Sequence, residues 1–273
     1  MKHLSRVYLT LIFGILYIPI LTLIFFSFNS TNSTAVFTGF SLKWYVELFN
    51  SPETFEALRN TLILAVLSAL ISTVIGTAAA EGIYRMRSKF IAESIKSVTN
   101  IPMMNPDIVT GMSMMLFFVL VAATLKLPYE EIGFFAMLIS HVTFCLPYVI
   151  LSVLPRINEL GNSLTEAAMD LGCTPFSAFF KVKLPNIMPG VLSGAVMAFT
   201  MSLDDFVISY FVGSSNFQTL PLLIYSMTKK KVTPDMYALS TLIIVTVFVL
   251  LVVSNFKSGK RLDAAKKKGG AKK

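Results

Sequence analysis

The chain has 273 residues, of which 55% are hydrophobic and only 14% are charged, whereas about 25% of the residues in an ordinary soluble domain are charged. Its mean hydropathy is +0.71, which excludes a soluble globular protein and indicates a membrane protein. The formal net charge of +8 comes mainly from residues 257–273, where eight basic residues accompany one acid. We interpret this tail as a cytoplasmic segment facing lipid headgroups, not as a nucleic-acid site.

Six segments are apolar and long enough to cross about 30 Å of hydrocarbon as helices. They lie near residues 7–28, 60–84, 95–123, 134–154, 189–212 and 237–256. The alternating pattern of barrel strands is missing, so the sequence predicts an all-α, polytopic membrane protein with six transmembrane helices in a single domain, 1–273.

The charged residues predict how the chain is oriented in the membrane. Lys2 and Arg6 precede an apolar run that is too long for a secretory signal and lacks an A-x-A cleavage site, so we interpret it as an uncleaved first span. With the N-terminus inside, seventeen of the 23 basic residues fall in cytoplasmic segments. Both termini are therefore predicted to be cytoplasmic, although the cluster 229–231 is a local exception.

The outer segment 29–59 is rich in Ser, Thr and Asn and also carries aromatic residues. Four of them, Phe40, Trp44, Tyr45 and Phe49, predict an amphipathic helix in the membrane interface. N-x-[ST] sequons begin at Asn29 and Asn32, and we interpret them as a polar turn that leaves the membrane. The two cysteines of the chain form no C-x-x-C pair and predict neither a disulfide nor a metal site.

The longest cytoplasmic segment, residues 156–188, is predicted to form two short helices around a break. Thr165 is a candidate N-cap for the first helix, and Gly172 can adopt the left-handed conformation that ends it. Pro175 suits the first turn of the second helix, which Leu184-Pro185 is expected to end.

This segment resembles the coupling loop of the permease subunits of bacterial ABC importers. The pattern of that family is E-A-A, three residues, G, nine residues, then I-x-L-P, and it is matched here except that Val182 replaces the isoleucine. In the family this loop sits in a groove of the ATPase subunit. The resemblance implies that a set of six residues couples the chain to the ATPase: Glu166, Ala167, Ala168, Gly172, Leu184 and Pro185. An incidental amphipathic hairpin is the alternative.

Further phrases, at residues 105–109, 140–147, 201–205 and 220–227, resemble the spermidine/putrescine branch of the same family. The resemblance implies the type I importer permease fold in the cytoplasmic (inner) membrane. It also implies three kinds of protein partner: a second homologous permease, two cytoplasmic ATPase subunits that bind ATP and Mg, and an external polyamine-binding protein. Beyond these and membrane lipid, no nucleic acid, metal or cofactor is expected to bind this chain.

Three acids occur where charge is costly: Asp107 in the third predicted span, and Asp204 and Asp205 in the fifth. An Asp at the centre of a spanning helix costs about 2.5 to 3.5 kcal/mol, so such residues normally face a cavity or a partner. At about 1.5 Å rise per residue, Asp107 and Asp204 are expected to lie at similar depth. We interpret these acids as the lining of a pathway for cations, and the alternative is that they hydrogen-bond to neighbouring helices or to a paired subunit.

Neighbouring side chains extend this predicted pathway. Ser202 and Asp205 belong to one polar stripe of the fifth predicted helix, whereas Asp204 lies about 100° away, so both acids are retained. The rings of Phe206 and Tyr148 could pack against ammonium groups and methylene spacers. His141, in contrast, is expected to be a packed, hydrogen-bonded residue rather than a proton relay.

These observations predict a permease subunit that moves polyamines by alternating access and is not itself an enzyme. No Walker A, H-E-x-x-H or G-x-S-x-G motif occurs, so no catalytic residue is assigned. The alternatives are an importer subunit for another solute (an iron complex, thiamine or sulfate), a proton-coupled secondary transporter, and a membrane-embedded enzyme. Three carboxylates argue against an anionic solute, and a secondary transporter would not explain the spacing of residues 166–185.

Overall fold

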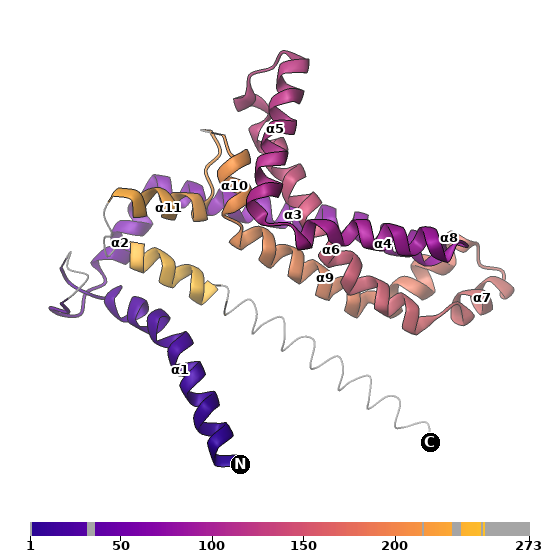
Figure 1. The fold of residues 1–273 in the computed structure, drawn as a ribbon, viewed down its shortest axis with the longest axis horizontal. Coiled ribbons are helices and arrows are strands. Elements are labelled where there is room, and N and C mark those ends of the chain that lie inside the picture. Colours follow the sequence, from indigo (N-terminus) through magenta and orange to yellow (C-terminus); the bar gives the residue numbers. More distant parts are fainter. Residues whose placement is uncertain (1, 32–35, 215, 231–235, 247, 249–273) are drawn as a thin grey trace. The chain divides into compact units, whose positions relative to one another are not determined.

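The computed structural model describes residues 2–31, 36–214, 216–230, 236–246 and 248, and within these residues the regular structure is helical (Figure 1). The helices, in chain order, are α1 (Lys2–Phe26), α2 (Lys43–Asn50), α3 (Pro52–Arg85), α4 (Lys89–Met104), α5 (Asp107–Leu125), α6 (Tyr129–Leu160), α7 (Ser163–Asp170), α8 (Pro175–Ala178), the π-helix η1 (Phe179–Lys183), α9 (Leu184–Asp204), α10 (Val207–Val212) and α11 (Leu220–Lys230). The all-α prediction is confirmed.

Among the described residues, five helical stretches are long and apolar enough to cross a membrane: Tyr8–Phe26, Pro52–Arg85, Asp107–Leu125, Tyr129–Leu160 and Pro175–Asp204. A shorter apolar helix, Met236–Thr246, coincides with the start of the sixth predicted span. The remainder of that span and the basic tail lie outside the described residues. By its contacts the chain divides into two compact units, one formed by Met1–Leu58 with Leu220–Lys273 and the other by Arg59–Thr219.

In the first unit, Asn29 organises the turn that follows α1. Its buried side-chain amide donates to the carbonyl of Val36 (2.8 Å), and its Oδ1 accepts the Thr38 N–H (2.9 Å). The Trp44 indole Nε1 donates to the backbone carbonyl of Asn29 (2.6 Å). These bonds satisfy polar groups that burial would otherwise leave unpaired. The first sequon therefore forms a turn, as predicted, while Asn32 lies outside the described residues.

The predicted amphipathic helix of the outer segment is observed as α2. Trp44 and Leu48 are buried, whereas Val46 and Phe49 are exposed. Leu48 belongs to a small apolar cluster of the first unit, together with Ala57, Leu220, Leu223 and Leu239.

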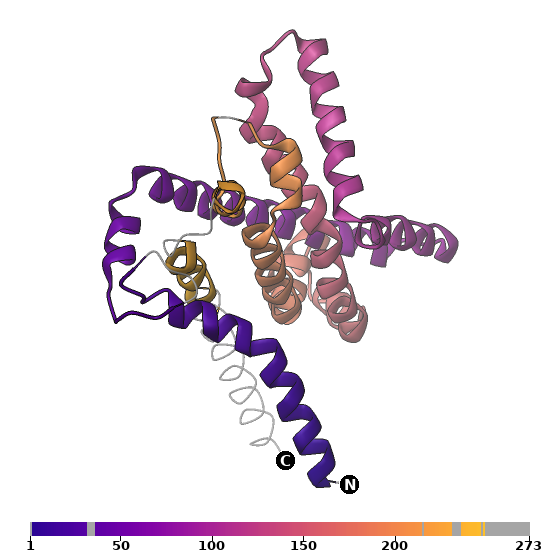
Figure 2. The ribbon, with the colours of Figure 1, turned by 60° about the vertical axis from the view of Figure 1, so that its left-hand side comes forward.

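The second unit is built around the pairing of α6 with α9, which run side by side in Figures 1 and 2. Two glycines four residues apart make this pairing close. A Cβ on Gly190 would lie 2.8 Å from the Ser152 carbonyl oxygen, and one on Gly194 would lie 3.2 Å from the Cα of Val149. Small residues at this spacing let helix backbones approach each other, which is how helices associate in lipid.

Two of the predicted spans are interrupted helices. The third, expected at 95–123, is divided into α4 and α5 by Asn105 and Pro106. Pro106 has no N–H and disfavours a helical conformation at Asn105, whose φ and ψ are −78° and 143°. The fifth, expected at 189–212, is divided into α9 and α10 at Asp205 and Phe206. Each expected continuous helix is therefore corrected to two helices, and the predicted acids lie at the two breaks.

Candidate functional site

The break between α9 and α10 is held by the side chain of Asp205. Its Oδ2 accepts the backbone N–H of Ser209 (2.9 Å) and its Oδ1 accepts that of Ile208 (3.3 Å). A carboxylate at this position satisfies N–H groups of the first helical turn and lies at the positive end of the helix dipole. The side chain is only 6% exposed, so Asp205 stabilises the break from within the second unit.

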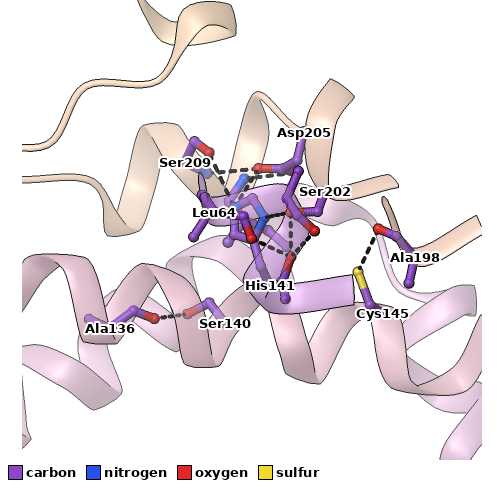
Figure 3. Close-up of polar contacts among 12 residues, drawn as sticks. Leu64, Ala136, Ser140, His141, Cys145, Ala198, Ser202, Asp205 and Ser209 are labelled. Atoms are coloured by element: carbon purple, nitrogen blue, oxygen red, sulfur yellow. Dashed lines mark hydrogen bonds and ion pairs between the residues drawn. The ribbon is translucent and has the colours of Figure 1, made fainter. Parts of the chain in front are cut away.

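A buried chain of polar groups joins Asp205 to three other helices (Figure 3). Ser68 Oγ of α3 lies 2.7 Å from Ser202 Oγ of α9, and Ser202 Oγ lies 2.7 Å from Nδ1 of His141 on α6. His141 Nε2 lies 3.5 Å from the Asp205 carboxylate and 3.3 Å from Ser209 Oγ. The predicted packed and hydrogen-bonded role of His141 is confirmed.

One arrangement of protons satisfies this network of hydrogen bonds. Ser202 donates to Nδ1 of His141, and the protonated Nε2 faces Asp205. The single hydroxyl proton of Ser68 lies between Ser202 Oγ and the Leu64 carbonyl oxygen, each 2.7 Å from Ser68 Oγ. We assign the neutral Nε2–H tautomer on this basis, because it leaves each hydroxyl and ring nitrogen with a partner. The network ties α3, α6, α9 and α10 together at the helix break.

Asp204 and Asp107 differ from Asp205 because both are exposed in the single chain. Asp204 is the last residue of α9, and Asp107 is the first residue of α5, directly after the Pro106 break. In the part of the chain that the structure describes, no basic side chain pairs with either carboxylate. These two acids are therefore the ones available to a mobile cation or to a partner subunit.

The two predicted aromatic residues each keep exposed surface and pack against a second ring. Tyr148 on α6 is partly exposed and stacks edge-on with Phe144 (5.7 Å between ring centroids). Phe206 lies in the break itself, with its ring 5.6 Å from that of Tyr210. Of the six predicted pathway residues, Asp205 and Ser202 meet in the buried network, while Asp107, Asp204, Tyr148 and Phe206 retain exposed surface.

The predicted coupling segment begins with α7, which carries Glu166, Ala167 and Ala168. Gly172 follows α7 with φ +90°. Its N–H donates to the carbonyl of Met169 (2.9 Å), and that of Cys173 donates to the carbonyl of Ala168 (3.0 Å). This is a Schellman motif, in which a glycine avoids the strain that a Cβ would meet at positive φ. The predicted left-handed end of the helix is confirmed.

Two expectations for this segment are corrected. Pro175 starts α8 as predicted, with Thr174 as the N-cap, but Leu184 and Pro185 do not end this helix. They are the first two residues of α9, which follows η1 directly, and a proline is tolerated there because first-turn N–H groups need no partner within the helix. Thr165 is not a cap either, because α7 begins at Ser163 and Thr165 is buried inside it.

Sequence reasoning missed a buried ion pair next to this segment. The Lys183 ammonium lies 2.8 and 3.0 Å from the two carboxylate oxygens of Glu81 on α3, and the Lys183 side chain is 1% exposed. The only signal in the sequence was a single acid near the end of a long apolar run, which pattern reasoning cannot connect to a lysine about a hundred residues later.

Comparison with known proteins places the chain in a family. Residues 72–258 match the model of the binding-protein-dependent transport system inner membrane component. The chain is 38% identical over 247 residues to the spermidine/putrescine transport system permease protein PotC of Escherichia coli K12, covering 90% of each chain. It is 39% identical over 238 residues to the putrescine transport system permease protein PotI of the same organism, covering 87% of this chain and 84% of the relative. The chain therefore belongs to the family of binding-protein-dependent ABC importer permeases.

Solved structures agree on the fold. A chain of a bacterial ABC transporter involved in the import of the acidic polysaccharide alginate has a TM-score of 0.77 at 18% sequence identity and covers 95% of both chains. A chain of the MetNI methionine ABC transporter has a TM-score of 0.61 at 19% identity and covers 77% of this chain. The chain thus has the fold of ABC importer permeases. Its family and curated relatives make it a permease rather than an enzyme, which lies across the inner membrane in several passes.

Proposed function

We propose that this chain is one of two transmembrane permeases of an ATP-driven importer that carries polyamines such as spermidine and putrescine. The observation that carries the substrate class is the pair of exposed acids, Asp107 and Asp204, each beside a break in a helix. A broken helix exposes backbone groups, and such backbone is tolerated at membrane depth where it borders a cavity or protein. The relatives named for spermidine and putrescine transport support the same assignment.

The pathway residues divide into two roles in this proposal. Asp107 and Asp204 attract the cationic groups of the substrate, while Phe206 and Tyr148 offer ring faces to its ammonium groups and methylene carbons. Asp205 and Ser202 support the pathway from inside the fold, because their hydrogen bonds hold the helix break at which Asp204 lies. The contacts are weak enough for release, since a tight site would trap the substrate.

The cytoplasmic segment 156–188 supplies the coupling. It exposes large apolar side chains on and around its two short helices, namely Leu164, Met169, Leu171, Phe176 and Phe180. Such a patch on a short segment fits a protein partner better than water. We propose that ATPase subunits, which bind ATP and Mg, receive this segment with Glu166 and the Gly172 turn at its centre, while a second permease and an external polyamine-binding protein complete the importer. Both termini face the cytoplasm in this arrangement.

Uptake of radiolabelled spermidine by the reconstituted importer tests the pathway. Asp204→Asn and Asp107→Asn remove the charge and keep the shape of the side chain, so each variant should lose uptake by at least about tenfold, the effect of about 1.4 kcal/mol of lost electrostatic stabilisation. The complex should still assemble, because neither carboxylate supports the fold of this chain.

Glu93→Gln on α4 provides the matched control, since Glu93 is an exposed acid away from both helix breaks. Normal uptake by the Asp107→Asn, Asp204→Asn double variant would contradict the pathway. A panel of solutes that includes thiamine and sulfate separates polyamines from the alternative substrates. Uptake driven without ATPase subunits would instead indicate a proton-coupled secondary transporter.

A further inference from the structure

The Lys183–Glu81 ion pair joins the predicted coupling segment to α3. Besides its two contacts with Glu81, the Lys183 ammonium lies 4.4 Å from the centroid of the Tyr84 ring. Arg85, one turn after Glu81, donates from its Nε to Oε1 of the same carboxylate. The Glu81 carboxylate therefore pairs with two cations, the buried Lys183 and the half-exposed Arg85.

Lys183 has a distinctive place in the chain. It is the variable residue of the V-x-L-P part of the family pattern, between Val182 and Leu184, and it is the last residue of η1, where the Leu184 N–H donates to the Phe179 carbonyl. This bond spans one residue more than an α-helical bond, and such π-turns are frequent at functional sites. The extra residue changes the direction in which the following side chains leave the helix.

A lysine is an expensive residue to bury, so stability alone does not account for this pair. Taking both charges out of water costs as much as their attraction returns, and an apolar pair of similar volume is often at least as stable. The ion pair instead holds the coupling segment and α3 at a fixed distance and angle, since charged hydrogen bonds resist changes in distance and angle more than apolar contacts do. Removal of Lys183 leaves Glu81 paired with Arg85 alone, whereas removal of Glu81 leaves the Lys183 charge buried and unpaired.

We propose that Lys183 and Glu81 are positioning residues through which movement of the coupling segment is transmitted to α3. The backbone runs without interruption from α8 through η1 into α9, so the segment moves α9 directly. The ion pair makes α3 follow the same movement. This inference rests on the proposed function, in which residues 156–188 engage the ATPase subunits.

The test uses the full importer with Lys183→Met and with Glu81→Gln, each of which removes one charge and keeps the length of the side chain. ATP hydrolysis stimulated by the loaded binding protein, measured per folded complex, should fall about tenfold, within the range of measured coupling effects. Basal hydrolysis and co-purification of the ATPase subunits should be unchanged. A packing role alone would instead lower the yield of folded complex and leave stimulated hydrolysis per folded complex unchanged.

Lys181→Met is the matched control, because Lys181 belongs to the same π-helix but is exposed, and it should keep normal stimulation. The Glu81→Met, Lys183→Met double variant leaves neither charge and should assemble but remain unstimulated. Normal stimulation in Lys183→Met or in the double variant would overturn the proposal. Failure of the double variant to assemble would overturn it as well, since the pair would then hold the fold rather than transmit movement.

A different result would contradict the proposed function itself. If residues 156–188 do not engage the ATPase subunits, Glu166→Lys leaves co-purification and stimulation intact, whatever the state of Lys183. If that variant loses the ATPase subunits while Lys183→Met behaves as wild type, the coupling segment stands and only the role of the ion pair is contradicted.

Discussion

Asp204 and Asp205 show how two identical, adjacent residues take different environments. Asp205 caps the first turn of α10 and faces His141 in the buried network, whereas Asp204 is exposed at the end of α9. The helix break separates them, because the chain leaves the helical path at Asp205 (φ −66°, ψ 122°). One carboxylate is thereby committed to the fold, and the other is free for a cation.

At this scale we predict that Asp205→Ala destabilises the importer and that Asp204→Ala does not. Loss of the cap costs about 1–2 kcal/mol, and His141 also loses the acceptor facing its Nε2, while an exposed side chain without structural contacts contributes less than about 0.5 kcal/mol. Thermal unfolding of the purified complexes in detergent measures both effects. Equal unfolding midpoints for the two variants would show that Asp205 has no structural role.

The elements of the second unit depend on close helix contacts and on interruptions. α6 and α9 approach each other at Gly190 and Gly194, and a Cβ on Gly111 of α5 would lie 2.9 Å from the Phe211 side chain of α10. Lipid offers no hydrophobic drive for helices to pair, so the packing itself must stabilise these contacts. The interruptions leave Asp107 exposed at the start of α5 and Asp204 exposed at the end of α9.

We therefore predict opposite effects for two Gly→Ala substitutions. Gly190→Ala introduces a methyl group 2.8 Å from a backbone carbonyl and 2.6 Å from Cγ of Arg156, so it should destabilise the complex by about 1–3 kcal/mol through overpacking. Gly82→Ala on α3 meets nothing within 4 Å and should be neutral or stabilising by up to about 1 kcal/mol. Denaturation in SDS measures both, and a Gly190→Ala variant as stable as Gly82→Ala would contradict the close packing.

In the molecule as a whole, two kinds of side chain that usually need a partner stay exposed: large apolar side chains and acids of the predicted membrane spans. Exposed apolar side chains on the segment 156–188 accompany the exposed acids at the helix breaks. Both features are explained if the functional unit is an assembly in which partners cover the segment and a second permease completes the pathway.

For this assembly we predict that Glu166→Lys reduces binding of the ATPase subunits. Glu166 lies exposed in the first turn of α7, where reversal of its charge opposes the helix dipole and any complementary charge on the partner. Co-purification of the ATPase subunits with tagged permease measures the loss. The control is Glu130→Lys, the same charge reversal in the first turn of α6, and retention of the ATPase subunits by both variants would contradict docking at α7.

Three features follow from the amino-acid sequence alone: the all-α membrane architecture, the family pattern of residues 166–185 and the acids at costly positions. These features are local, because apolar length, motif spacing and residue type depend only on residues that are close together in the sequence. Gly172 is an example, because a left-handed residue after a helix requires only its neighbours.

Which residues share an environment follows from the packed helices and not from the sequence. The tertiary structure divided two predicted spans at Pro106 and Asp205, distinguished the buried Asp205 from the exposed Asp204, and paired Lys183 with Glu81. Sequence periodicity assumes a continuous helix, so it cannot show where a break turns the chain. It also cannot connect two charges 102 residues apart, because only packing of the helices brings them within hydrogen-bonding distance.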